Sequence, residues 1–260
     1  MPDDPFARTA FILLRPKSPG NVGSTARAMK NMGFRHLILA DPMSYEDPEY
    51  FHTEAGRMAW NASDVLQEMR QTPTLEDALA PYSFVLGTTS VPPPGARALR
   101  PEESAREVAA LLHSDPSARA ALLFGQEDIG LTRDQLARCQ AIGVIPAAAA
   151  YPSLNLAQAA LVFAWELRRS LLGPAGEGAT AEPSSPDARP PQERLESFYV
   201  RLEEALDEIA FLQGSSRAHM MRELRQLFNR TLLTTRELAM LEGIVHQVMW
   251  AARRGKPPRA

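Results

Sequence analysis

The chain has 260 residues, of which 45% are hydrophobic and 23% charged, and its formal net charge is −3. This length and composition are those of a globular protein with one large domain or a domain plus a small appendage. The charge excludes a bulk attraction for nucleic acid, so any such binding must use a local basic patch. The single cysteine, Cys139, excludes a disulfide framework and a cysteine-based metal site within one chain.

The sequence lacks the signals that are typical of several other classes of protein. No apolar run approaches the roughly 18 residues that a membrane-spanning helix needs, and residues 1–6 have neither the basic nor the apolar part of a signal peptide. The five histidines do not have metal-ligand spacing, and no Gly-x-Ser-x-Gly elbow occurs. We therefore expect a cytoplasmic protein that binds neither membrane nor metal.

Apolar runs alternate with helix-like segments along the first 172 residues. Five apolar runs predict strands, at Ala10–Leu14, His36–Ala40, Ser83–Gly87, Ala120–Phe124 and Ala141–Ile145. Helix-like patterns lie at Val22–Met32, Thr74–Ala80, Pro101–His113, Thr132–Cys139 and Leu156–Leu172. Because the strands are almost continuously apolar, they indicate a parallel sheet that helices cover on both faces. The order of the elements predicts an α/β fold.

Capping signals support these boundaries. Thr74 and Thr132 each precede a helix-like segment and have a polar partner three residues later, which fits N-terminal capping. Gly33 stands where a left-handed residue would end a helix. Asn155 can cap the long apolar helix that follows it.

The last third of the chain differs in composition. Residues 173–191 are rich in Pro, Gly and small polar residues, which predicts a flexible linker. Residues 192–260 follow as a helical extension, because Leu195, Phe198 and Leu202 step at helical spacing and Thr234 opens a further capping box. The predicted organisation is thus an α/β domain at 1–172, a linker at 173–191 and a helical extension at 192–260.

Charge is concentrated in local stretches. Residues 15–40 contain five Lys or Arg and no acid, whereas residues 217–260 contain nine Lys or Arg against three Glu. Residues 192–216 have the opposite balance, with two Arg against six acids. Such stretches fit either an RNA phosphate-binding patch or a solvated helix face. The two basic stretches together favour nucleic acid.

Three short polar segments each follow an apolar run and lead into a helix-like pattern: Asn21–Arg27, Phe124–Leu131 and Ser153–Leu156. The carboxyl ends of parallel strands are where α/β folds bind ligands, and three such segments point to an enzyme. Neither a dinucleotide fingerprint nor a P-loop is present. The acids in the second segment, Glu127 and Asp128, lie in a loop before a helix and could bind an arginine, a ligand amine or the start of that helix. Taken alone, the first segment also fits a capped helix with a polar exposed face.

At these residues the chain resembles the SpoU-type RNA 2′-O-methyltransferases of the SPOUT class, also called the TrmH family. The resemblance covers residues 8–172 and rests on three motifs in order: Asn21-x-Gly23-Ser24-x-Ala26-Arg27, Phe124-Gly125-x-Glu127-x-x-Gly130-Leu131, and Ile145-Pro146 through Ser153-Leu154-Asn155-Leu156-Ala157. The helical extension resembles that of the TrmJ-type subgroup. The resemblance implies a deep trefoil knot, a homodimer, S-adenosylmethionine as cofactor and tRNA as partner.

The resemblance also implies roles for particular residues. Arg27 matches the catalytic position, and Asn21, Glu127 and Asn155 match positions that shape the site. The implied cofactor-binding residues lie on three loops: Thr88, Thr89, Ser90, Gly125, Ile145, Pro152, Ser153 and Leu154. Pro152 stands where members of the family often have serine, and it removes one backbone donor.

The implied activity is methylation of a ribose 2′-hydroxyl at position 32 of the tRNA anticodon loop, on cytidine, uridine or both. The family view makes Arg27 the base. Because a guanidinium side chain keeps its proton at neutral pH, we favour instead a clamp on the phosphate and the 2′-oxygen. The alternatives are an rRNA 2′-O-methyltransferase of the same family and a non-catalytic RNA-binding protein on the same fold.

Overall fold

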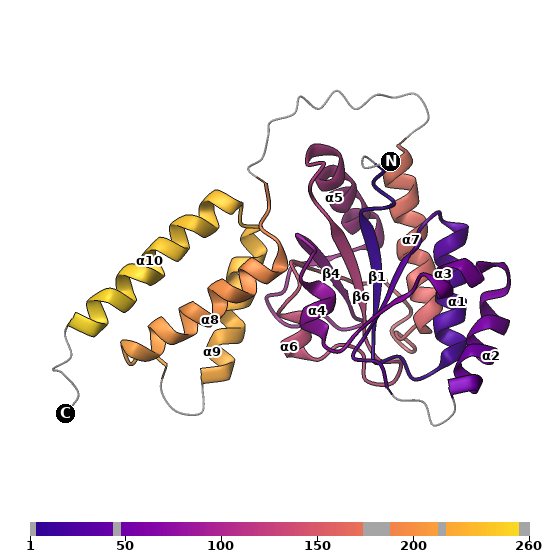
Figure 1. Ribbon diagram of the computed structural model, residues 1–260, viewed down its shortest axis with the longest axis horizontal. Coiled ribbons are helices and arrows are strands. Elements are labelled where there is room, and N and C mark those ends of the chain that lie inside the picture. The colour runs from indigo at the N-terminus through magenta and orange to yellow at the C-terminus, as the bar shows by residue number, and fades with distance from the viewer. Residues whose placement is uncertain (1–3, 44–47, 174–187, 213–216, 255–260) are drawn as a thin grey trace.

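A computed structural model of the chain describes residues 4–43, 48–173, 188–212 and 217–254 (Figure 1). The first part contains a seven-stranded sheet in the order β3-β2-β1-β6-β4-β7-β5, and every neighbouring pair is parallel. The strands are β1 (Thr9–Leu14), β2 (His36–Ala40), β3 (Arg70–Thr72), β4 (Phe84–Thr88), β5 (Ala98–Leu99), β6 (Ala120–Phe124) and β7 (Ala141–Gly143). The predicted parallel α/β sheet is confirmed.

Helices cover both faces of the sheet, as predicted (Figure 1). One face packs against α1 (Pro19–Asn31), α2 (Pro48–Ala59), α3 (Ser63–Gln67), α5 (Pro101–Ser114) and α7 (Leu156–Leu172). The other face packs against α4 (Leu75–Leu79) and α6 (Arg133–Leu136). Alternate residues of a strand point to opposite faces, so Phe11 and Leu13 belong to the first core and Ile12 to the second.

Some predicted boundaries were wrong. Helix α1 begins at Pro19 instead of Val22, because Ser18 caps it and proline is favoured in the first helical turn. Strand β7 ends at Gly143, two residues before the predicted end. The sequence patterns missed β3, β5, α2, α3 and the 3₁₀ turn η1 (Trp60–Ala62).

The predicted caps are present. Thr74 and Thr132 accept hydrogen bonds from the third residue of their helices, and Asn155 accepts from the first turn of α7. Gly33 follows α1 with a φ of +86°, the left-handed conformation expected of it. Local sequence signals thus mark the starts of α4, α6 and α7 and the end of α1.

The C-terminal part is helical, as predicted, with α8 (Gln192–Glu208), α9 (Arg217–Thr231) and α10 (Thr235–Arg254). Its own core gathers Leu195, Phe198, Tyr199, Leu238 and Val245. In Figure 1 these helices lie beside the α4 and α6 side of the sheet. Of the predicted linker, residues 174–187 lie outside the described residues.

Several charges of the C-terminal helices have intramolecular partners. Arg217 pairs with Glu203 and Asp207, and Arg225 pairs with Glu196. These arginines therefore join the basic and acidic stretches to each other. Arg230, Arg236 and Arg253 are exposed.

Within the described ranges, no helix combines the length and apolar character needed to cross a membrane. In the same ranges, no group of three or more His, Cys, Asp or Glu side chains could hold a metal ion.

Candidate active site

A cavity of about 680 Å³ opens where β4, β6 and β7 end. All eight residues that the resemblance assigns to cofactor binding line this cavity, at positions 88–90, 125, 145 and 152–154. Glu127 and Asn155 line it as well. Three loops that are far apart in the sequence therefore meet at one edge of the sheet, as the carboxyl ends of parallel strands require.

One chain of hydrogen bonds joins the three polar segments. The Asn155 amide donates to Asn21 Oδ1 at 2.9 Å, and the Asn21 amide donates to Glu127 Oε1 at 2.9 Å. Asn155 Oδ1 also accepts from the backbone N–H groups of Ala157 and Gln158 at the start of α7. Each amide therefore uses its oxygen and its nitrogen for different partners, which fixes its orientation.

The Glu127 carboxylate holds the start of α1. It accepts from the backbone N–H of Lys17 at 2.8 Å and from that of Ser18 at 3.0 Å. Partial burial opposes ionisation of this carboxyl, but the hydrogen bonds from Asn21, Lys17 and Ser18 outweigh burial and lower its pKa. Glu127 therefore binds the start of α1, which is not the helix that follows its own loop and was not among the partners that the sequence suggested. The neighbouring acid, Asp128, forms an ion pair with the Lys17 ammonium.

Two glycines let the chain close around the cavity. A Cβ on Gly125 would lie 2.2 Å from the carbonyl carbon of Gly130, where the loop turns back and Gly130 N–H bonds to Gln126 O at 2.7 Å. A Cβ on Gly143 would lie 2.7 Å from the ring of Phe163. Any larger residue at either position would displace a wall of the cavity.

The first loop is tied to both neighbouring strands. The Thr88 hydroxyl donates to Leu123 O of β6 at 3.0 Å, and the Thr89 backbone N–H donates to Gly143 O of β7 at 3.1 Å. These bonds fix the relative positions of the three strand ends. Apart from Glu127 and Asp128, the residues that line the cavity are uncharged.

Arg27 does not line the cavity of its own chain. It lies on the exposed face of α1 with Lys30, while Val22, Ala26 and Met29 are fully buried on the opposite face. Lys30 pairs with Asp64 at 2.8 Å. The structure therefore brings Asn21 into contact with the site but leaves Arg27 outside it.

Sequence reasoning missed several residues of the cavity wall. Ile129 and Tyr151 are large apolar side chains in the loops, with 66% and 80% of their surface exposed. Gln158 and Phe163 line the cavity from α7. For Ile129, an aliphatic residue inside the otherwise polar stretch at 125–130 was the available signal. No local signal distinguishes Phe163 from an ordinary core residue.

The fold and cavity define a class: an open parallel α/β protein whose ligand site lies where several strands end. The sequence profile of the SpoU rRNA methylase family matches residues 8–165, and that of the C-terminal domain of the tRNA methyltransferase TrmJ matches residues 193–257. The chain therefore belongs to the SpoU methylase family and carries a TrmJ-type C-terminal domain. It is a methyltransferase, as predicted, and family membership confirms S-adenosylmethionine as its cofactor.

Individual relatives agree over nearly the whole chain. The tRNA (cytidine/uridine/adenosine-2′-O-)-methyltransferase TrmJ of Pseudomonas aeruginosa is 36% identical over 255 residues, covering 95% of each chain. The tRNA (cytidine/uridine-2′-O-)-methyltransferase TrmJ of Sodalis glossinidius is 36% identical over 92% of this chain and 90% of its own. The crystal structure of TrmJ from Z. mobilis superposes with a TM-score of 0.76 at 32% identity, covering 94% of this chain and all of that one.

Proposed function

We propose that the protein transfers a methyl group from S-adenosylmethionine to the ribose 2′-hydroxyl at position 32 of tRNA anticodon loops, on cytidine, uridine or both. The observation that carries this proposal is a cavity lined by the second and third motifs, to which Asn21 of the first motif is joined by hydrogen bonds with Glu127 and Asn155. The relatives matched along nearly their whole length are named as tRNA enzymes, which favours tRNA over rRNA.

The cavity suits S-adenosylmethionine. Its volume falls within the range of roughly 300–1,000 Å³ that small-molecule sites occupy. Backbone groups of the loops at 88–90, 125 and 152–154 offer donors and acceptors, and Ile145, Leu154 and Phe163 offer apolar walls. Gly125 and Gly143 let Gly130 and Phe163 pack closely against them, and this packing shapes the wall of the cavity.

The cofactor would supply an already activated sulfonium methyl group. The remaining task of the protein is to hold the ribose 2′-oxygen about 3 Å from that methyl and in line with the sulfur. Glu127 and Asn155 support this by fixing the loop after β6 and the start of α7 on opposite sides of Asn21. We assign the eight loop residues to cofactor binding on this basis.

Arg27 is assigned the clamp on the target phosphate and the developing charge of the 2′-oxygen. Because it lies outside the cavity of its own chain, it would act in a homodimer, in the cavity of the second copy. An exposed apolar stripe on α7 supports such a dimer: Leu161, Trp165 and Leu172 are 39–57% exposed at helical spacing. Helix α7 packs directly against α1, which carries Arg27.

The role of Arg27 is tested by comparing Arg27→Ala with Arg35→Ala, which removes another exposed arginine of the same basic stretch. We expect Arg27→Ala to lower kcat roughly 100- to 1,000-fold, the loss typical of a group that stabilises transition-state charge. Calorimetry without tRNA should give wild-type affinity for S-adenosylmethionine in both variants. Near-normal turnover by Arg27→Ala would exclude both roles considered for Arg27, the phosphate clamp and the general base.

The substrate position is tested with tRNA carrying a 2′-deoxy nucleotide at position 32, since that oxygen is the proposed acceptor. Methyl transfer should disappear, whereas a deoxy nucleotide elsewhere in the loop should leave it intact. If the tRNA that carries a 2′-deoxy nucleotide at position 32 is still methylated, the target lies at another nucleotide. Transfer to rRNA alone would support the rRNA alternative, and no transfer to any RNA would support the RNA-binding alternative.

Further parts of the proposal follow from the family. We propose that the segments at 88–90, 125–130 and 145–155 form the deep trefoil knot, that the protein is cytoplasmic, and that 1–172 is the catalytic domain. The linker at 173–191 and the helical extension at 192–260 complete this organisation. The exposed Arg230, Arg236 and Arg253 are the cations that the extension offers to tRNA phosphates.

A further inference from the structure

We propose that Gln192, the first residue of α8, is a positioning residue for the cofactor cavity. It holds β4 and β7 together from the C-terminal domain, so affinity for S-adenosylmethionine depends on the docked C-terminal helices even when no RNA is bound. The inference rests on the proposed function only in taking S-adenosylmethionine as the ligand of the cavity.

Gln192 joins the two chain segments that enter these strands. Its backbone N–H donates to Tyr82 O at 2.9 Å, two residues before β4. Its side-chain Oε1 accepts from Gln140 Nε2 at 2.9 Å, and its Nε2 donates to Arg138 O at 2.9 Å, both just before β7. Gln192 is only 2% exposed, so its polar atoms depend on these partners.

Gln140 extends the connection into the sheet. Its backbone N–H donates to Val85 O at 3.0 Å, and its Oε1 accepts from the Val85 N–H at 2.7 Å. Gln140 is 4% exposed, and Val85 lies in β4. A continuous series of hydrogen bonds therefore runs from α8 through Gln192 and Gln140 into β4.

Strand β7 gains support from this contact because its own pairing is short, whereas β4 also pairs with β6 over four residues. The β4–β7 ladder contains three residue pairs, from Leu86↔Ala141 to Thr88↔Gly143. On its other side β7 pairs only with the two residues of β5. The far ends of β4 and β7 carry Thr88 and Gly143, which line the cavity. The contact at Gln192 thus lies only a few residues from the cofactor loops.

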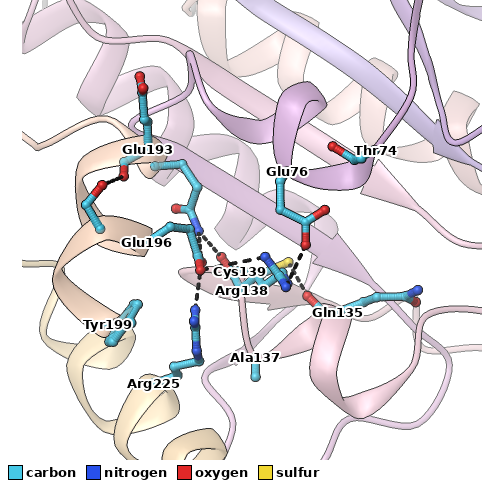
Figure 2. A network of polar contacts seen from close by, with 12 residues as sticks. Thr74, Glu76, Gln135, Ala137, Arg138, Cys139, Glu193, Glu196, Tyr199 and Arg225 are labelled. Carbon is cyan, nitrogen blue, oxygen red and sulfur yellow. Dashed lines mark hydrogen bonds and ion pairs between the residues drawn. The ribbon is translucent and has the colours of Figure 1, made fainter. Parts of the chain in front are cut away.

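Next to the Gln192 contact, charged side chains link α8, α9 and α4 with the segment that precedes β7 (Figure 2). Glu196 accepts from Arg225 at 2.7 Å and lies 3.6 Å from Arg138, which also pairs with Glu76 of α4 at 2.7 Å. Figure 2 shows these side chains converging between α8 and the segment that precedes β7. This network resists separation of the two parts, so Gln192 stays seated against β4 and β7.

The test uses the full-length chain and calorimetric titration of S-adenosylmethionine without tRNA. Gln192→Leu keeps the approximate volume but leaves Gln140 Nε2 and Arg138 O without their partner. We expect its Kd to rise at least about fivefold, roughly 1 kcal/mol. At saturating cofactor, kcat should stay within about twofold of wild type, because the reacting groups are unchanged. A loss of folded protein would not weaken the affinity for the cofactor while leaving kcat unchanged.

Arg201→Ala is the matched control, because it breaks an exposed ion pair with Glu242 inside the C-terminal domain and touches neither strand. Its Kd should equal that of wild type. If Gln192→Leu does not fold, the test uses Gln192→Asn instead, which shortens the same side chain by one methylene. Unchanged cofactor affinity in the folded Gln192 variant would overturn the inference. Failure of the wild-type chain to bind S-adenosylmethionine would instead refute the proposed function.

Discussion

At the scale of single residues, the site depends on polar side chains that find each other across the sequence. Asn21 and Glu127 are 106 residues apart, and Asn155 and Asn21 are 134 apart. The motifs predicted that these residues belong to one site, but no sequence pattern shows which amide bonds to which carboxylate. Such contacts depend on the relative placement of strand ends, which only the folded sheet defines.

Glu127→Gln tests this carboxylate through pH. The lowered pKa of Glu127 means that its contribution to stability is present above the ordinary value of 4.5 and is lost as pH falls below it. We expect Glu127→Gln to cost about 1–3 kcal/mol at pH 7, because an amide cannot accept from all three donors. The difference from wild type should shrink towards pH 3.

Urea unfolding from pH 7 to pH 3 measures this effect, with the exposed Glu68→Gln as control. A difference between wild type and Glu127→Gln that stays constant over this range would show that the Glu127 charge does not hold the start of α1.

At the scale of helices and strands, close packing explains a motif residue that chemistry does not. Gly23 belongs to the first motif, yet a Cβ there would lie 2.0 Å from Ala55 O, in the middle of α2. Gly23 therefore lets α1 and α2 approach closely at this point. The sequence missed α2 altogether, so this use of Gly23 could not be predicted. Apolar runs did predict β2 and β6 with their observed bounds, because consecutive apolar residues make up nearly all of β2 and all of β6.

Gly23→Ala should therefore destabilise the protein by at least about 2 kcal/mol, since backbone blocks the added methyl. Gly56→Ala is the matched control on the facing helix, where an added Cβ meets nothing within 4 Å. It should stabilise the protein by about 0.5–1 kcal/mol, because alanine is the better helix former. Thermal unfolding of both variants measures the difference in stability. Equal melting temperatures would show that the close approach of α1 and α2 does not require glycine at position 23.

At the scale of the whole molecule, buried polar contacts unite the two parts. Asn229 of α9 donates to Ala137 O at 2.8 Å and Cys139 O at 3.2 Å, and accepts from the Tyr199 hydroxyl at 2.9 Å. Arg222 of α9 also pairs with Asp134 of α6 at 2.8 Å. Sequence analysis predicted both parts but not their docking, because the partners lie about 90 residues apart.

Asn229→Ala removes two hydrogen bonds to the α/β part and one to Tyr199 inside the C-terminal part, and it leaves these buried partners unpaired. We expect wild type to unfold in one calorimetric transition, and the variant to show two, because the C-terminal helices then melt first. Arg236→Ala, at the exposed start of α10, should keep the single transition. A single transition at the wild-type temperature in Asn229→Ala would show that the two parts are held by other contacts.

The place of β1 between β2 and β6 has a consequence for synthesis on the ribosome. All six residues of β1 are buried, but β6 and the carboxylate that anchors Lys17 lie about 110 residues later in the chain. At elongation rates of about 5–20 residues per second, the nascent chain waits roughly 5–20 s for them. During that interval β1 is an apolar strand with one unpaired edge, the kind of surface that aggregates unless it is shielded. The emerging polypeptide thus offers a chaperone a defined target until residue 124 has left the exit tunnel.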